Sequence, residues 1–109
     1  MSLSMAAGAA VPAATPNAEI EGLLTSLGSS QCQFYRNGSW HGGAEAESHL
    51  RMKYDYMARK GAVTSAEQFI DQAATKSSLS GEAYAVKCGA DPQQPSATWL
   101  KARLQERRG

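Results

Sequence analysis

The two cysteines, Cys32 and Cys88, constrain the fold more than any other feature of this sequence. They lie 56 positions apart, with no CxxC motif and no histidine pair at zinc-finger spacing, so a metal site is a poor interpretation. A disulfide would bring two distant segments together and stabilise a small domain by roughly 3 to 4 kcal/mol. The alternative is two separate buried thiols, because free cysteine is among the most buried residue types.

The core available to this chain is small. Hydrophobic residues make up 42% of its 109 residues, but 19 of them are alanines, which bury little surface, so we expect one domain. A formal charge of +1 gives no reason to expect nucleic-acid binding, and no apolar run is long enough to predict a membrane span. We therefore expect no nucleic-acid partner and no membrane span. We also expect a monomer.

Residues 1–15 are small, alanine-rich and uncharged. They lack the basic start and the leucine-rich centre of an intact signal peptide, and Met5 after MSLS is typical of vector-derived residues joined to a processed start. We interpret 1–15 as a disordered arm left beside a signal cleavage site and 16–108 as a single α+β domain. Together with the predicted disulfide, this favours an exported protein.

Four segments carry apolar residues at helical spacing, and each is predicted as a helix. The first begins at a Thr15 cap, with a proline in its first turn, and ends at Gly28. The third begins at a capping box that starts at either Thr64 or Ser65, and it ends near Lys76. The four apolar faces consist of Ile20, Leu23, Leu24 and Leu27; Ala46, Leu50, Tyr54 and Met57; Ala66, Phe69, Ile70 and Ala73; and Trp99, Leu100 and Leu104.

Asn37 and Gly38 predict a β-hairpin, because this pair tolerates the positive φ angles of a type I′ turn. A two-residue loop places Tyr35 opposite Trp40 on one side of the hairpin. That aromatic pair is either buried under a helix or exposed as a partner site.

In segment 82–88, the larger apolar residues Tyr84, Val86 and Cys88 alternate with Ala83, Ala85 and Lys87. This alternation predicts a third strand. If it runs antiparallel to the first strand, Cys88 lies opposite Cys32 and Val86 lies opposite Phe34. One register then explains both the disulfide and an apolar face. The sequence therefore predicts an α+β fold in which a three-stranded, mostly antiparallel sheet packs with four α-helices.

Segment 75–81, TKSSLSG, combines hydroxyl groups, a lysine and a turn, which together could form an anion-binding concavity. Alternatively, its serines satisfy the carbonyls at the helix end and turn the chain into the strand. Arg36, Arg51 and Lys53 could add positive charge nearby. For Arg51 and Lys53, a solvated helix face is an equally good explanation. The candidate ligand-binding residues are Arg36, His49, Arg51, Lys53, Lys76, Ser77, Ser78, Ser80 and Gly81.

His41, Glu45 and His49 are spaced by four and would align as zinc ligands on a continuous helix. Two glycines interrupt that helix, so we expect no metal site. The nucleophile and phosphate-loop motifs GxSxG, SxxK, GxxxxGK and GxGxxG are all missing, so we assign no catalytic residue and no cofactor. The alternative is an enzyme acting on cell-wall material, with His49 and Glu45 as acid and base.

Four motifs in order, FYRNG at 34–38, SHLRMKY at 48–54, SAEQFID at 65–71 and KSSLSGEAYAVK at 76–87, resemble the YfeK-like family of small exported bacterial proteins. This family is a domain of unknown function (DUF5329-like). The resemblance implies a bacterial protein with a signal peptide, periplasmic or secreted, which agrees with the export predicted above. It implies no activity or cofactor, and it does not imply the disulfide.

We therefore expect a non-enzymatic envelope protein that binds a protein, glycan or peptide through its basic and serine-rich surface. The enzyme described above is one alternative. A purely structural stabiliser without a ligand is another.

Overall fold

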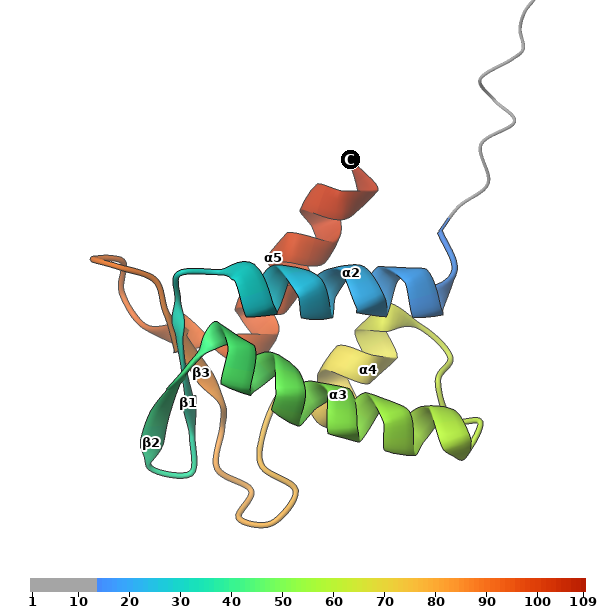
Figure 1. The fold of residues 1–109 in the computed structure, drawn as a ribbon, viewed down its shortest axis with the longest axis horizontal. Helices are drawn as coiled ribbons and strands as arrows, with labels where there is room; N and C mark the ends of the chain where they lie inside the picture. The colour runs from blue at the N-terminus through green and yellow to red at the C-terminus, as the bar shows by residue number, and fades with distance from the viewer. Residues whose placement is uncertain (1–13) are drawn as a thin grey trace, which may run out of the picture.

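The computed structural model describes residues 14–109, which form four helices and one antiparallel sheet (Figure 1). The predicted arm lies almost entirely outside this range. Within it, no helix is both long and apolar enough to cross a membrane. The helices are α2 (Pro16–Ser29), α3 (Gly43–Arg59), α4 (Ala66–Ala73) and α5 (Ser96–Arg108), and the strands are β1 (Gln33–Arg36), β2 (Ser39–Gly42), β3 (Ala85–Lys87) and β4 (Gln94–Pro95).

The first helix forms as its sequence predicts. The Thr15 hydroxyl accepts a hydrogen bond from the Ala18 backbone N–H at 3.1 Å, and proline occupies the first turn of α2. Its four predicted apolar residues are all buried. The start of α3 packs closely on the end of α2, because a Cβ atom on Gly43 would lie 2.5 Å from the Leu27 carbonyl oxygen.

The hairpin has the predicted turn and register. Asn37 and Gly38 have φ angles of 49° and 89°, as a type I′ turn requires. Tyr35 pairs with Trp40 across β1 and β2.

The third strand also pairs as predicted. β3 runs antiparallel to β1 with Val86 opposite Phe34, and a disulfide joins Cys32 to Cys88, whose Cα atoms lie 4.2 Å apart. The strand is shorter than predicted, since only residues 85–87 form a continuous ladder.

The sheet has four strands rather than the three predicted, in the order β2-β1-β3-β4. The fourth strand is Gln94–Pro95, which pairs with β3. A two-residue strand shows no alternation in the sequence, and proline argues against a strand except at a sheet edge, where its missing N–H is tolerated.

The third helix ends at Ala73, three residues before the predicted end near Lys76. The Thr75 hydroxyl donates to the Ile70 carbonyl at 2.9 Å, and the Lys53 ammonium donates to the Ala73 carbonyl at 2.8 Å. These side chains take the place of the next helical turn. At its start, the Ser65 hydroxyl accepts from the Gln68 N–H at 3.0 Å, so Ser65 is the cap.

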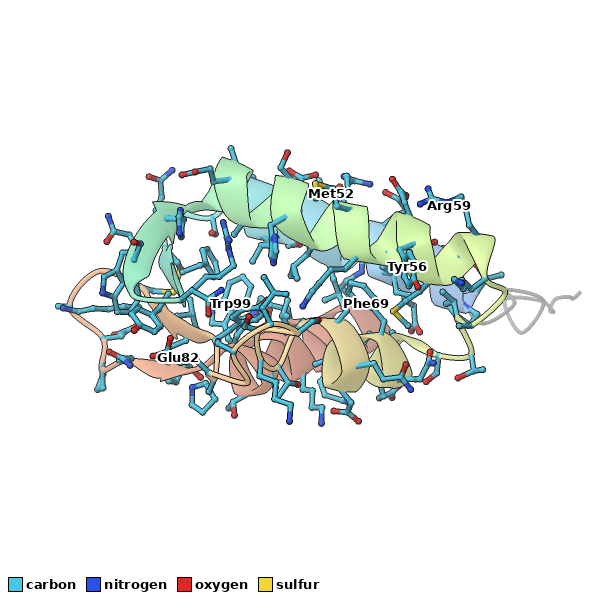
Figure 2. The ribbon with its side chains drawn as sticks, turned by 90° about the horizontal axis from the view of Figure 1, so that it is seen from below. Met52, Tyr56, Arg59, Phe69, Glu82 and Trp99 are labelled. Atoms are coloured by element: carbon cyan, nitrogen blue, oxygen red, sulfur yellow. A yellow bond between two sulfur atoms is a disulfide. The ribbon has the colours of Figure 1, made fainter. Side chains whose placement is uncertain are left out.

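The core lies between the inner face of the sheet and the four helices. Phe34 of the sheet packs edge-to-face on Trp99 of α5, with ring centroids 5.5 Å apart. Figure 2 shows Phe69 and Trp99 beneath α3, whereas Met52 and Arg59 point away from them. Most of the apolar residues predicted to face inward are buried, while Ala46 and Met57 are only partly so.

Candidate functional site

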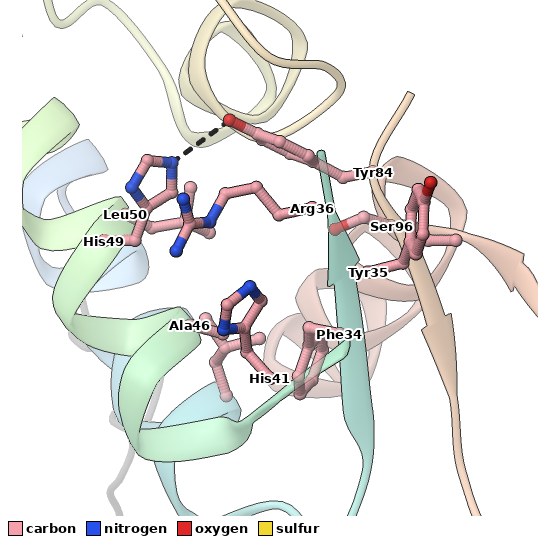
Figure 3. A pocket seen from close by; sticks show the side chains of 11 residues that line it. Phe34, Tyr35, Arg36, His41, Ala46, His49, Leu50, Tyr84 and Ser96 are labelled. Carbon is pink, nitrogen blue, oxygen red and sulfur yellow. Dashed lines mark hydrogen bonds between the residues drawn. The ribbon is translucent and has the colours of Figure 1, made fainter. Parts of the chain in front are cut away.

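A small cavity of about 30 Å³ opens between the hairpin and α3. Leu27, Phe34 and Leu50 contribute apolar walls. We name its polar side the basic pocket, which consists of Arg36, His41, His49 and Tyr84 (Figure 3). The cavity has room for a water molecule or for one small polar group of a ligand.

The secondary structure brings these four side chains together. Arg36 is two residues after the buried Phe34 in β1, so both side chains project from the same face of the strand. His41 is the register partner of Phe34 in β2, and His49 comes from α3. Tyr84 is held by backbone hydrogen bonds of 3.0 Å to both Thr75 and Ser96.

The hydroxyl of Tyr84 connects His49 to Lys53. It lies 3.1 Å from Nε2 of His49 and 3.0 Å from the Lys53 Nζ, which can only donate. Burial, together with the positive charges of Arg36, Lys53 and His41, lowers the pKa of His49 to about 4. His49 is therefore neutral at pH 7, and we assign its Nε2 as the acceptor of the Tyr84 hydroxyl proton.

Arg36 is half-buried and reaches toward the ring of His49, with His41 on its other side (Figure 3). No ion pair or side-chain hydrogen bond within residues 14–109 involves Arg36. Glu45 contacts Nδ1 of His41 at 3.4 Å and is largely exposed. The pocket therefore presents a guanidinium whose donors are free for an anion.

The structure places Arg51 apart from this pocket. Its guanidinium contacts Glu21 of α2 at 2.6 Å and Glu47 of α3 at 2.9 Å. Hydrogen bonds to these two carboxylates raise the pKa of Arg51. Two positions along a helix are about 200° apart, so Arg51 and His49 occupy opposite sides of α3.

The serine-rich segment is held by its own hydrogen bonds and by the hairpin tip. The Ser77 hydroxyl is buried and accepts from the N–H groups of Leu79 and Ser80 at 3.2 and 3.3 Å. Asn37 donates to Ser77 at 3.2 Å and accepts from the Ser80 hydroxyl at 2.7 Å. This geometry favours a structural role for Ser77 and Ser80, with Gly81 at a φ of +75° closing the turn.

The remaining candidates divide between these two regions. Lys53 lies beside the pocket, but its ammonium is engaged by the Ala73 carbonyl and the Tyr84 hydroxyl. Ser78 lines a neighbouring groove that also includes His49 and Lys53, and Lys76 is exposed. Of the predicted candidates, Arg36 and His49 line the cavity, and Lys53 contacts its Tyr84 wall from the neighbouring groove.

Sequence reasoning missed two residues of the basic pocket: His41, which was considered only as a zinc ligand, and Tyr84. The alternating pattern of 82–88 assigned it to an apolar strand face, and it is indeed buried. Its hydroxyl nevertheless carries the contact to His49, whereas Glu45, proposed as the acid or base beside His49, contacts His41. Within residues 14–109, no three histidine, cysteine or acidic side chains are grouped to hold a metal ion.

Comparison with known proteins identifies the family. The model of a family of unknown function, DUF5329, matches residues 14–108. "Uncharacterized protein YfeK" of Salmonella typhimurium is 40% identical over 68 residues, which cover 62% of this chain and 55% of that protein. The aligned stretch thus spans about half the length of this curated relative, and no solved structure matches. Because the family model matches nearly the whole chain, and the four ordered motifs resemble the same family, the chain belongs to the DUF5329 family.

Proposed function

We propose that this protein is a non-enzymatic binding module that holds an anionic group of its ligand in the basic pocket. The observation that carries the proposal is the half-buried guanidinium of Arg36, which has no acidic partner within residues 14–109. A guanidinium binds carboxylate or phosphate through two parallel N–H donors. Partial burial strengthens such a contact, because less water competes for the ligand.

The surroundings of Arg36 favour an anion over a cation. Burial is the main cause of the lowered pKa of His49, and the charges of Arg36 and Lys53 lower it further, so positive potential already acts at this point. A bound anion would offset that potential and stabilise the protonated imidazolium, so binding should raise the pKa of His49. The shared chemistry of the ligand is therefore a carboxylate or a phosphate group, of the kind carried by acidic glycans and peptide termini.

The test is a titration of the protein with sodium phosphate and with sodium acetate, followed by NMR of the histidine rings. We expect saturable shifts at His41 and His49, and at least about tenfold weaker binding in Arg36→Gln. Arg51→Gln is the matched control, since it removes an arginine whose carboxylate partners lie elsewhere. Sodium chloride at equal ionic strength separates site binding from screening.

Equal shifts in Arg36→Gln and in the parent protein would contradict the anion site. The absence of any saturable shift would leave the structural stabiliser as the better interpretation. The enzyme alternative has less geometric support, because Glu45 contacts His41 rather than His49.

We also propose that the protein works outside the cytosol. The support is the disulfide between Cys32 and Cys88, because such bonds persist in oxidising compartments and are rare in the cytosol. We expect the native protein in the periplasmic or secreted fraction, with both sulfurs resistant to alkylation until a reductant is added. Recovery from the cytosol with two alkylated thiols would contradict this proposal.

A further inference from the structure

A row of apolar side chains crosses the outer face of the sheet, opposite the basic pocket. The register pairs Trp40 with Tyr35, Tyr35 with Ala85, and Ala85 with Pro95, so each of the four strands contributes one residue. Neighbouring strands are about 4.8 Å apart, which places Tyr35 and Pro95 about 10 Å from each other across Ala85. We name these four residues the outer row.

The helices leave this face open. They lie to one side of the sheet in Figure 1, and Figure 3 shows Tyr35 on the opposite side of β1 from the two histidines. Trp40 is 39% exposed and packs edge-to-face on Tyr35, with ring centroids 5.4 Å apart. An exposed aromatic pair on an uncovered sheet face is a common feature of binding surfaces.

An open hollow of about 370 Å³ lies over the middle of the row. Tyr35 and Pro95 border it, and the small side chain of Ala85 leaves the space between them unfilled. Its volume falls within the range of small-molecule sites. The hollow therefore has the apolar Ala85 at its base and the aromatic ring of Tyr35 at one side.

The polar groups of the hollow select the ligand. Glu82 accepts a hydrogen bond from the Tyr35 hydroxyl at 2.9 Å, and its ionised carboxylate can only accept. Gln93 and Gln94 add amide donors and acceptors, and none of the residues lining the hollow is cationic. An anionic ligand would be repelled by Glu82, and a continuous polyproline segment has no backbone N–H to donate to that carboxylate. Sugar hydroxyls both donate and accept.

We propose that the outer row binds an uncharged oligosaccharide, with one pyranose ring lying on the Tyr35–Trp40 aromatic pair. The hydroxyls of the sugar donate to Glu82 and exchange hydrogen bonds with the amides of Gln93 and Gln94. This site lies across β1 from the two histidines of the basic pocket, although Tyr35, Tyr84 and Ala85 border both cavities.

The test is NMR titration of the ¹⁵N-labelled protein with chitotetraose, cellotetraose and maltotetraose, each at up to about 10 mM to detect weak binding. The two tryptophans give separate indole N–H signals, and Trp99 is buried. We expect at least one oligosaccharide to shift the Trp40 indole together with the Glu82 and Ala85 amides, and to leave the Trp99 indole in place.

Two variants and one control make this result specific. Trp40→Ala removes the exposed ring and Ala85→Val fills the hollow, and each should weaken binding about tenfold or more. Met52→Ala is the control, because Met52 is 68% exposed on α3, away from the sheet. An unchanged Trp99 indole signal shows that each variant has folded.

Three outcomes would overturn the proposal. One is no shift of the Trp40 indole with any of the three oligosaccharides. Another is equal binding by the parent, Trp40→Ala and Ala85→Val. The third is a shift caused by decaproline instead, which would identify the face as a peptide site.

Discussion

Arg36 and Arg51 show how strongly the role of a residue depends on its neighbours. Both arginines were candidates for the same basic surface. Arg51 is neutralised by two carboxylates, whereas Arg36 faces two imidazoles and has no acidic partner within residues 14–109. Only the second arrangement leaves a guanidinium able to bind a new anion.

His49 predicts a pH dependence of stability. Its pKa is about 4 in the folded protein, below the ordinary value of 6.5, mainly because of burial. Between pH 6.5 and pH 4 the unfolded chain binds more protons than the folded one, so the free energy of unfolding falls as the pH falls through this window. Because the ring is partly solvated, we expect a loss of about 1 to 2 kcal/mol.

Urea denaturation of the parent protein and of His49→Gln at a series of pH values measures this effect. The variant should lose less stability than the parent between pH 6.5 and pH 4, because it lacks the titrating ring. Parallel stability curves for the two proteins would show that His49 has an ordinary pKa in the folded state.

At the scale of the elements, the contact between α2 and α3 depends on a glycine. A Cβ atom on Gly43 would approach the Leu27 backbone oxygen to 2.5 Å, and backbone atoms cannot move aside easily. We expect Gly43→Ala to destabilise the protein by about 1 to 3 kcal/mol, although alanine is the better helix former.

Gly22→Ala is the matched comparison for that prediction. Gly22 lies inside α2, and its added Cβ would meet only the outer end of the exposed, flexible Arg107 side chain. The gain in helix propensity should therefore dominate and stabilise the protein by about 0.5 to 1 kcal/mol. Thermal unfolding of both variants should give midpoints shifted in opposite directions, and shifts of the same sign would contradict this account of the contact.

The strands and helices differ in how strongly local sequence signals predict them. α2 and the hairpin carry local signals, a cap with proline and an Asn-Gly turn, and both form as predicted. β4 carries no such signal, because two residues show no alternation and one of them is proline. Pairing with β3, together with the hydrogen bond from the Ser96 N–H to the Tyr84 carbonyl, determines its extended conformation.

At the scale of the whole molecule, the sheet separates two surfaces of different chemistry. Its inner face, covered by helices, contributes Arg36 and His41 to the basic pocket, and its outer face carries the aromatic pair. The alternation of side chains along β1 produces this division, since Tyr35 and Arg36 point to opposite faces. One short strand therefore supplies a residue to each proposed site.

The sequence by itself predicted the four helices and the hairpin register, because each depends on local periodicity or turn chemistry. The pairing of Cys32 with Cys88 followed only from an assumed antiparallel register, which the structure contains. Only the tertiary structure decided which charged side chains lack an ion-pair partner and which hydroxyls already make hydrogen bonds. Arg51 meets Glu21 across 30 positions, and Tyr84 meets His49 across 35. Such contacts depend on how elements pack in space, and no local pattern in the sequence specifies that.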